Sequence, residues 1–379
     1  MSEIVERLKG KKVLILYTAH TSGHARIAEN IGYWLQQGGA DVVLREVLKS
    51  NPSPLVKNFL RLHVWVNVHV PQVWSFLYRY GFWVVMMPWR LLAAWFNRGE
   101  IQKVVHEVQP ALIITTQTSP SAVVNVLKWS GVYSGQWGIA FSDYHFHRAW
   151  LYPRADFYLT NIPEQAGHVL KHGVDKKNIF QIGFALPPRA TVDVQAVRAR
   201  LKVDDHARVI LVGSGSLGVR MPEELFVACE KVVARCAEEG VACRVIVACG
   251  RNGALLCELE ERVVRGASWL LPLGYYNPMA ELYAVADIFV TKPGGLSIVE
   301  ATQWGLPIIV THTLPGQEDL NATYLNKHGL ITDLTQIDEA LWPEMLKSLL
   351  ERDVVLNQQM SESVRSCGSV LGWWISGRL

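Results

Sequence analysis

Two glycine-rich segments have the composition of phosphate-binding turns. Residues 291–301 read Thr-Lys-Pro-Gly-Gly-Leu-Ser-Ile-Val-Glu-Ala, which places two glycines between an apolar strand and the start of a helix. Glycines let backbone N–H groups approach a ligand, and the positive end of the helix favours an anion. Residues 213–218, Gly-Ser-Gly-Ser-Leu-Gly, follow an earlier apolar run in the same way. Each segment alone also fits an ordinary turn, but together they favour a nucleotide diphosphate.

His24 is the candidate general base. It opens the helix that follows the first apolar run, Lys12–Tyr17, after the polar loop 18–23. A cation is disfavoured at a helix N-terminus, so we expect the pKa of His24 to shift downward and leave a neutral imidazole. Such a group can accept a proton from a hydroxyl. The alternative, a histidine merely satisfied by loop carbonyls, applies equally to His20.

Asp143, His145 and His147 alternate along the chain. On a strand they would share one face, where a metal site is conceivable. Because no fourth ligand is evident, we predict no metal site and favour hydrogen-bonding roles near a second substrate. Asp143 either orients His24 or holds that substrate, and the sequence leaves both open.

Alternating strands and helices must position these residues. Apolar runs at 12–17, 41–47, 111–116, 137–141 and 156–159 are separated by helical or loop segments, and a second series begins at 208 and continues at 243, 269, 287 and 307. This alternation predicts an α/β protein with two Rossmann-like, doubly wound domains facing a cleft. We place the first domain at 1–185, the second at 186–345, and a helical segment that packs on the first domain at 346–379.

Charge is distributed unevenly along the 379 residues. The net charge of +3 is too small to indicate a nucleic-acid partner. Between Val47 and Gly99, however, there is no Asp or Glu, while six basic residues and five of the 14 tryptophans occur there. This composition predicts an insertion at about 50–98 that meets anionic lipid, although a pair of core helices is the alternative. The candidate contacts are Trp74, Trp83, Trp89, Arg79 and Arg90.

The remaining composition bears on where the protein works. Six cysteines without a C-x-x-C pair indicate reduced thiols in the cytoplasm, and the N-terminus lacks the pattern of a secretory signal. The most apolar run, residues 82–96, is interrupted by Pro88 and Arg90 and is shorter than the ~20 residues that span a bilayer. We therefore expect peripheral association with the cytoplasmic face of a membrane.

Four motifs together resemble one enzyme family. They are the loop that ends in Ser-Gly-His24, the segment 142–153 (Ser-Asp-Tyr-His-Phe-His-Arg-Ala-Trp-Leu-Tyr-Pro), the helix start at 291–301, and Pro-Gly-Gln-Glu-x-x-Asn-Ala at 315–322. The chain is similar, over about 12–329, to the monogalactosyldiacylglycerol synthases and processive diacylglycerol glucosyltransferases, relatives of the peptidoglycan lipid-intermediate GlcNAc transferase. It departs from them in the first loop, which has Thr21-Ser22-Gly23 where relatives usually carry two or three glycines.

The resemblance implies a GT-B fold and inverting transfer of a hexose from a UDP-sugar to a membrane lipid hydroxyl, without a cofactor or an essential metal. His24 would deprotonate the acceptor, Gly294 and Gly295 would contact the diphosphate, and Glu300 would bind ribose. Gln317 and Glu318, with Asn321 behind them, would contact the donor sugar. The full set of candidate donor-binding residues is Gly213, Ser214, Gly215, Ser216, Gly218, Lys292, Gly294, Gly295, Ser297, Glu300, Gln317, Glu318 and Asn321.

Three alternatives stay open. A sugar-nucleotide epimerase or hydrolase shares this architecture and needs no lipid. A catalytically silent binding protein is suggested by the thinned glycine loop before His24. A third alternative keeps the chemistry but takes a polyprenyl-linked or aromatic lipid as the acceptor.

Overall fold

A computed structural model gives the fold and describes residues 10–18, 23–47, 70, 76, 87–313 and 316–351. The chain divides into two compact units, with the division between Pro187 and Pro188. The short segment Gly316–Leu320 groups with the first unit, and the described residues from Asn321 onward group with the second. Most of the predicted insertion at 50–98, and the C-terminal segment from 352 onward, lie outside the described residues.

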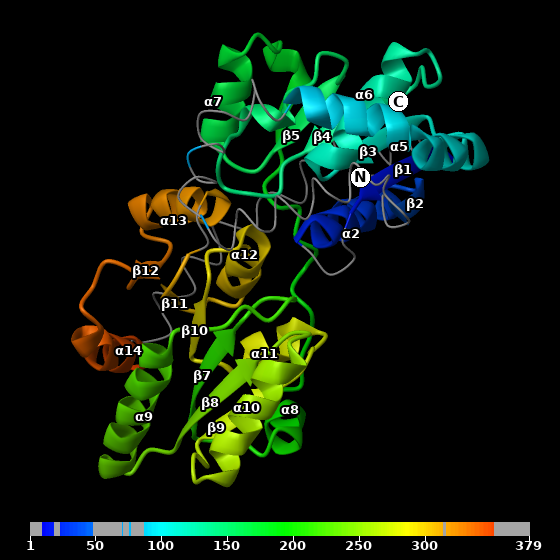
Figure 1. The fold of residues 1–379 in the computed structure, drawn as a ribbon. Helices are drawn as coiled ribbons and strands as arrows, with labels where there is room; N and C mark the ends of the chain where they lie inside the picture. The colour runs from blue at the N-terminus through cyan, green and yellow to red at the C-terminus, as the bar shows by residue number, and fades with distance from the viewer. Residues whose placement is uncertain are drawn as a thin grey trace. The chain divides into compact units, whose positions relative to one another are not determined.

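The first unit is built on a parallel sheet whose strand order is β2-β1-β3-β4-β5-β6 (Figure 1). Its strands are β1 (Lys12–Tyr17), β2 (Asp41–Glu46), β3 (Leu112–Thr115), β4 (Gln136–Ala140), β5 (Phe157–Thr160) and β6 (Ile179–Gln181). The apolar runs are buried because helices cover both faces of the sheet, as parallel sheets require. Strand order reverses between β1 and β3, which makes the carboxyl ends of these two strands the expected ligand site.

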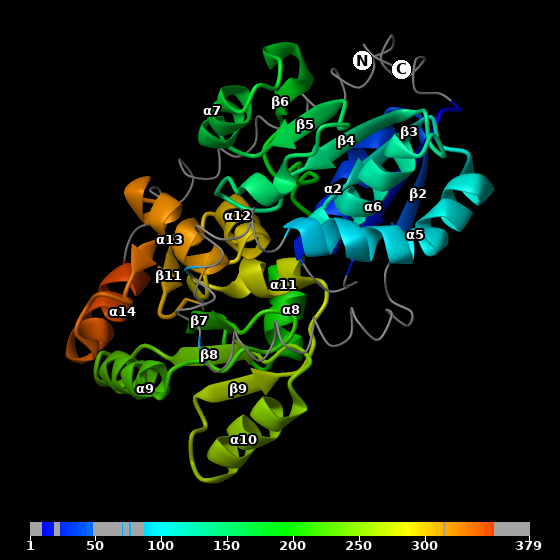
Figure 2. The ribbon, with the colours of Figure 1, turned by 45° about the horizontal axis from the view of Figure 1, so that its top comes forward.

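Helices pack on both faces of this sheet. They are α2 (Gly23–Gln37), α5 (Met87–Val108), α6 (Thr118–Trp129) and α7 (Pro163–Lys171), with short 3₁₀ turns at Arg148–Trp150 and Lys176–Asn178. Figure 2 shows α5 and α6 on one face, where they share a core with Leu14, Leu16 and Ile113. Ile15 points to the opposite face, where α2 packs. This alternation along β1 is the period of two that a strand imposes.

The second unit repeats the same plan. Its parallel sheet has the order β12-β11-β10-β7-β8-β9, so the order reverses between β7 and β10. The strands are β7 (Arg208–Gly213), β8 (Cys243–Ala248), β9 (Leu270–Leu273), β10 (Ile288–Thr291), β11 (Ile308–Val310) and β12 (Thr332–Asp333). The expected ligand site of this unit is therefore the pair of loops after β7 and β10.

Helices cover this second sheet as well. They are α8 (Val194–Arg200), α9 (Glu223–Glu238), α10 (Gly253–Val264), α11 (Met279–Val285), α12 (Gly295–Gln303), α13 (Gln317–Lys327) and α14 (Trp342–Leu350), with a 3₁₀ turn at Glu339–Leu341. α9 and α14 lie side by side and bury Val232, Cys236 and Leu346 in a core with the sheet (Figure 1). The prediction of two Rossmann-like, doubly wound domains is thus confirmed.

No helix in the described parts of the chain is both long enough and apolar enough to cross a membrane.

Candidate functional site

His24 lies at the point where the strand order of the first sheet reverses. It is the second residue of α2, directly after the loop that follows β1, and Thr116 follows β3. His24 Nδ1 is 2.9 Å from the carbonyl oxygen of Thr116, and the Thr116 hydroxyl donates to the His24 carbonyl at 2.8 Å. A ring nitrogen that faces a carbonyl must carry its proton, so Nδ1 is the donor and Nε2 keeps a lone pair. This tautomer is the one that a general base requires.

Burial lowers the pKa of His24 below its ordinary value, and this effect outweighs the opposing influences of the Asp143 carboxylate and the Thr116 carbonyl. The direction matches the sequence prediction, but the main cause is desolvation rather than the helix N-terminus. The ring of Trp150 lies 6.4 Å from the imidazole, measured between centroids, and is itself buried. The histidine is therefore neutral at pH 7 and able to accept a proton.

The Asp143 side chain is buried and accepts two hydrogen bonds within the first unit. The Ser142 hydroxyl donates to Asp143 Oδ2 at 3.0 Å, and the Gln317 side-chain amide donates to the same oxygen at 2.7 Å. Both donors favour the charged carboxylate. His24, Asp143 and Gln317 were predicted as base, partner and sugar contact, and the first unit brings all three into one polar cluster. Glu318, next to Gln317, is buried.

The segment after β4 is irregular. β4 ends at Ala140, so Asp143, His145 and His147 do not alternate on a strand. His147 Nδ1 accepts from the backbone N–H of Ala149 and begins a 3₁₀ turn, and both histidines are buried. Among the described residues, no group of three or more His, Cys, Asp and Glu side chains is arranged to hold a metal ion.

Two residues that sequence reasoning missed hold this irregular segment. Asn161 follows β5 directly, and Gln165 is the third residue of α7. Both side chains are buried. Their amide groups donate to backbone carbonyls in the segment that contains Asp143. Thr116, the partner of His24, was also missed. A polar residue directly after a strand next to the reversal point is a signal that could have identified Thr116, whereas nothing local marks Gln165.

The second unit brings its two glycine loops together at its own reversal point. The Thr291 hydroxyl, at the end of β10, donates to the Gly213 carbonyl at the end of β7 at 3.0 Å. A Cβ atom at Gly215 would lie 3.1 Å from Cε of Lys292, so this lysine extends over the first loop. The cationic side chain and the loop amides form one surface suited to a phosphate.

The glycines in these loops serve different purposes. Gly218 has a positive φ of 72°, and a Cβ atom there would overlap the carbonyl oxygen of Cys249 in a neighbouring loop. Gly294, which precedes α12, has an ordinary φ of −72°, and a Cβ atom there would meet nothing within 4 Å. Packing therefore explains Gly218 but not Gly294. Open space beside a glycine at a helix N-terminus is what close approach of a ligand requires.

The N-terminus of α12 keeps its backbone donors. No side-chain hydrogen bond caps this helix among the described residues, and its first residues include Gly295 and Ser297. Asn321, fully buried on α13, donates to the Pro293 carbonyl at 3.1 Å and fixes the turn that leads into α12. Glu300 is the sixth residue of α12 and is half-buried.

Ser214 and Ser216 differ in what they offer. The Ser214 hydroxyl is completely buried and donates to the Ala248 carbonyl at 2.6 Å, so it ties β7 to β8. Ser216 is half-buried, and its carbonyl accepts from the Arg251 N–H at 3.0 Å. Of these two candidates, Ser216 has the more accessible position for a ligand.

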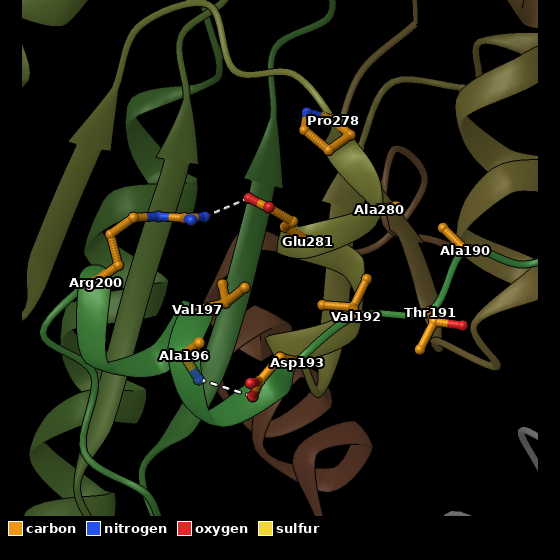
Figure 3. A pocket seen from close by; sticks show the side chains of 10 residues that line it. All are labelled: Ala190, Thr191, Val192, Asp193, Ala196, Val197, Arg200, Pro278, Ala280 and Glu281. Atoms are coloured by element: carbon orange, nitrogen blue, oxygen red, sulfur yellow. Dashed lines mark hydrogen bonds and ion pairs between the residues drawn. The ribbon is translucent and has the colours of Figure 1, made fainter.

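A cavity of about 210 Å³ in the second unit is lined by other residues (Figure 3). Ala190, Thr191 and Val192 line it together with α8 and α11. Its charged groups engage neighbours, because Arg200 pairs with Glu281 and Asp193 accepts from the N–H of Ala196. None of the predicted donor-binding residues lines this cavity, so it is no part of the candidate site.

Only part of the predicted lipid-facing insertion can be located. Trp74, Trp83 and Arg79, and the side chain of Trp89, lie outside the described residues, while Arg90 lies half-buried on α5. An aromatic patch continues from there, with Leu92, Trp95, Phe96 and Trp129 exposed on α5 and α6. The rings of Trp95 and Trp129 lie 6.0 Å apart, and the Arg98 guanidinium stacks 3.8 Å above Trp95. We call these five residues the aromatic patch.

Two family profiles match the sequence. The one described as monogalactosyldiacylglycerol (MGDG) synthase matches residues 24–186, and the one described as glycosyltransferase family 28 C-terminal domain matches residues 209–366. Among curated proteins, the processive diacylglycerol beta-glucosyltransferase of Bacillus cytotoxicus is 25% identical over 364 residues, covering 95% of this chain and 90% of that protein. The protein of the same description from Bacillus subtilis is 26% identical over 354 residues, covering 92% and 89%.

Solved glycosyltransferase structures share the fold. Acinetobacter baumannii MurG superposes with a TM-score of 0.56 at 15% identity, covering 97% of this chain and 98% of that chain. Medicago truncatula UGT71G1, solved with UDP-glucose, superposes with a TM-score of 0.62 at 14% identity, covering 100% and 99%. The fold is GT-B, as the sequence resemblance implied.

Proposed function

Because the chain belongs to the family of monogalactosyldiacylglycerol synthases and processive diacylglycerol glycosyltransferases, we propose that it transfers a hexose from a UDP-sugar to the hydroxyl of diacylglycerol or a glycolipid, with inversion. The observation that carries the proposal is the fixed tautomer of His24. Its Nδ1–H is bonded to Thr116, so Nε2 is available to a hydroxyl.

The proposed reaction needs a base for the acceptor hydroxyl and positive charge at the departing diphosphate. His24 Nε2 accepts the acceptor hydroxyl's proton while that oxygen forms a bond to the anomeric carbon of the donor. The bond from that carbon to the diphosphate oxygen breaks, and UDP leaves with the electron pair. The Asp143 carboxylate stabilises the imidazolium that forms, which is consistent with its raising effect on the pKa of His24. Lys292 and the amides at the start of α12 stabilise the charge on the departing diphosphate.

The donor is assigned to the residues of the two glycine loops and of α12 and α13. Gly294 and Gly295 contact the diphosphate, with Lys292, Gly215 and Ser216 beside it, and Glu300 binds the ribose. Gln317 and Glu318 contact the sugar, and Asn321 holds the turn that precedes α12. No metal or organic cofactor belongs to the proposal, because the lysine and the helix N-terminus already supply positive charge at the diphosphate.

The lipid acceptor is proposed to come from an anionic membrane that the protein meets peripherally, on its cytoplasmic face. The aromatic patch of the first unit, Leu92, Trp95, Phe96, Arg98 and Trp129, supports this proposal. Exposed tryptophan rings prefer the headgroup region of a bilayer, and arginine is attracted to anionic lipid. His145 and His147, in the segment after β4, are proposed to line the path of the acceptor.

Labelled transfer tests the proposal directly. Purified protein is incubated with labelled UDP-galactose, UDP-glucose or UDP-GlcNAc, with diacylglycerol or a total membrane lipid extract, and with or without EDTA. We expect label in a lipid product from at least one donor, unchanged by EDTA. Free sugar formed without lipid would favour a hydrolase or epimerase, and tight UDP binding without turnover would favour a silent binding protein. Label found only in a polyprenyl-linked lipid would identify that lipid, rather than diacylglycerol or a glycolipid, as the acceptor.

A further inference from the structure

The buried side chain of Gln165 uses all of its hydrogen-bonding groups inside the first unit. Its Nε2 donates to the carbonyl oxygen of Asp143 at 2.7 Å and to that of His145 at 2.9 Å, and its Oε1 accepts from the N–H of Asn161 at 2.8 Å. The residue has no exposed surface. A glutamine with both amide hydrogens and its oxygen engaged has a single orientation.

Asn161 completes the arrangement from the end of β5. Its Nδ2 donates to the carbonyl oxygens of Phe141 and Asp143, each at 3.1 Å. The carbonyls of residues 141, 143 and 145 are therefore all held by two side-chain amides. The segment lies beyond the end of β4. The Phe141 N–H still donates to the Leu159 carbonyl of β5 at 3.0 Å, but the residues that follow it belong to no strand. We refer to Asn161 and Gln165 as the amide clamp.

We propose that the amide clamp positions the Asp143 carboxylate relative to His24, so that Asn161 and Gln165 are positioning residues for proton transfer. Asp143 is the residue whose carbonyl receives a hydrogen bond from both amides. Rotation of its backbone would move the carboxylate, which is the charged group that acts on His24. This inference rests on the proposed function, in which His24 is the base.

A purely structural role for Gln165 predicts different behaviour. Loss of a buried hydrogen bond anywhere in the sheet lowers thermal stability, but it does not change the electrostatic environment of one histidine. The distinguishing quantity is therefore the pKa of His24. If Asp143 moves away, its raising effect is lost and the pKa of His24 falls further.

The test compares Gln165→Met with Thr160→Val. Methionine keeps the length of the side chain but has no amide. Thr160 is a completely buried residue next to Asn161, and its hydroxyl donates to the Phe180 carbonyl, which is not one of the clamped carbonyls. Imidazole NMR titration of the full chain, with the His24 signal assigned by its loss in His24→Gln, gives the pKa without any turnover. We expect the pKa of His24 to be lower in Gln165→Met than in the unsubstituted protein. We also expect kcat to be reduced roughly tenfold to a hundredfold, with KM for the UDP-sugar unchanged. Thr160→Val leaves the pKa of His24 unchanged.

A double-mutant comparison shows whether the effect passes through Asp143. Asp143→Asn lowers the pKa of His24 by itself, and adding Gln165→Met to that background produces no further shift. If Gln165→Met does not fold, Asn161→Leu provides the same measurement from the other half of the amide clamp. An unchanged His24 pKa in a folded clamp variant would overturn the inference. The titration needs no substrate, so it tests the amide clamp independently of the transfer assay. Absence of transfer would refute the proposed function, and the pKa of His24 in the clamp variants would still decide the inference.

Discussion

The two units place different kinds of chemical group at the same topological position. Both sheets are parallel and reverse their strand order once, between β1 and β3 in the first unit and between β7 and β10 in the second. In the first unit this position is occupied by side chains, with His24 and Thr116 joined by two reciprocal hydrogen bonds. In the second it is occupied by backbone, with glycine loops after both strands and one lysine over them.

The difference follows from what each group has to do. A base must have one nitrogen available at a defined place and pKa, so it needs neighbours that fix its tautomer and its charge. A diphosphate is recognised by several amides and a cation, so it needs backbone that a ligand can reach. The first site is consequently dense with buried polar side chains, and the second keeps space open at Gly294.

Loss of the base should have the largest effect. His24→Gln removes the group that accepts the proton, and we expect kcat to fall roughly 10³-fold while UDP binding by calorimetry is retained. The unsubstituted enzyme should lose activity as pH falls through the pKa of His24, and because burial lowers that pKa, the acid limb should lie below 6.5. Transfer that persists in His24→Gln, or an acid limb above 6.5, would assign the base to another residue.

A pair of glycine substitutions should separate binding from packing in the second unit. Gly294→Ala places a methyl group where no protein atom lies within 4 Å, so we expect unchanged thermal stability and a KM for the UDP-sugar raised roughly tenfold. Gly218→Ala meets the Cys249 carbonyl at a positive φ and should lose about 1–3 kcal/mol of unfolding free energy. Melting curves and initial rates measure both. If Gly294→Ala lowered the melting temperature as much as Gly218→Ala, the contrast between the two glycines would be wrong.

The sequence predicted the elements better than the reasons for individual residues. β1 was expected at its observed bounds, and β8 at its observed first residue, because runs of apolar residues that are buried on both faces mark the strands of a parallel sheet. β4 was expected to continue through Phe141, but it ends at Ala140, and the segment that follows is shaped by amides some twenty residues away. Contacts over that separation leave no periodic signal, so the amide clamp could not be predicted.

The glycine loops show the same limit in the second unit. Composition placed both loops after strands, which was correct, because glycine and serine clusters break regular patterns wherever they occur. Composition could not distinguish Gly218 from Gly294, since the distinction depends on whether a neighbouring loop fills the space beside the Cα atom. Composition also could not show that the Ser214 hydroxyl, a candidate phosphate contact, instead donates to the Ala248 carbonyl and joins β7 to β8.

The smallest expected effect concerns the outer surface, where the units also differ. Large apolar side chains are exposed in both units. In the first unit, Trp95 and Trp129 lie with Arg98 in the aromatic patch. In the second unit, Val264 on α10 is 87% exposed and forms part of no such cluster among the described residues. Trp129→Ser should reduce binding to vesicles of phosphatidylglycerol and phosphatidylcholine roughly threefold to tenfold, because about 1 kcal/mol of apolar burial is lost. Val264→Ser should leave vesicle binding unchanged. Co-sedimentation measures both variants, and equal losses would mean that exposed apolar area alone, rather than the aromatic patch, brings this protein to lipid.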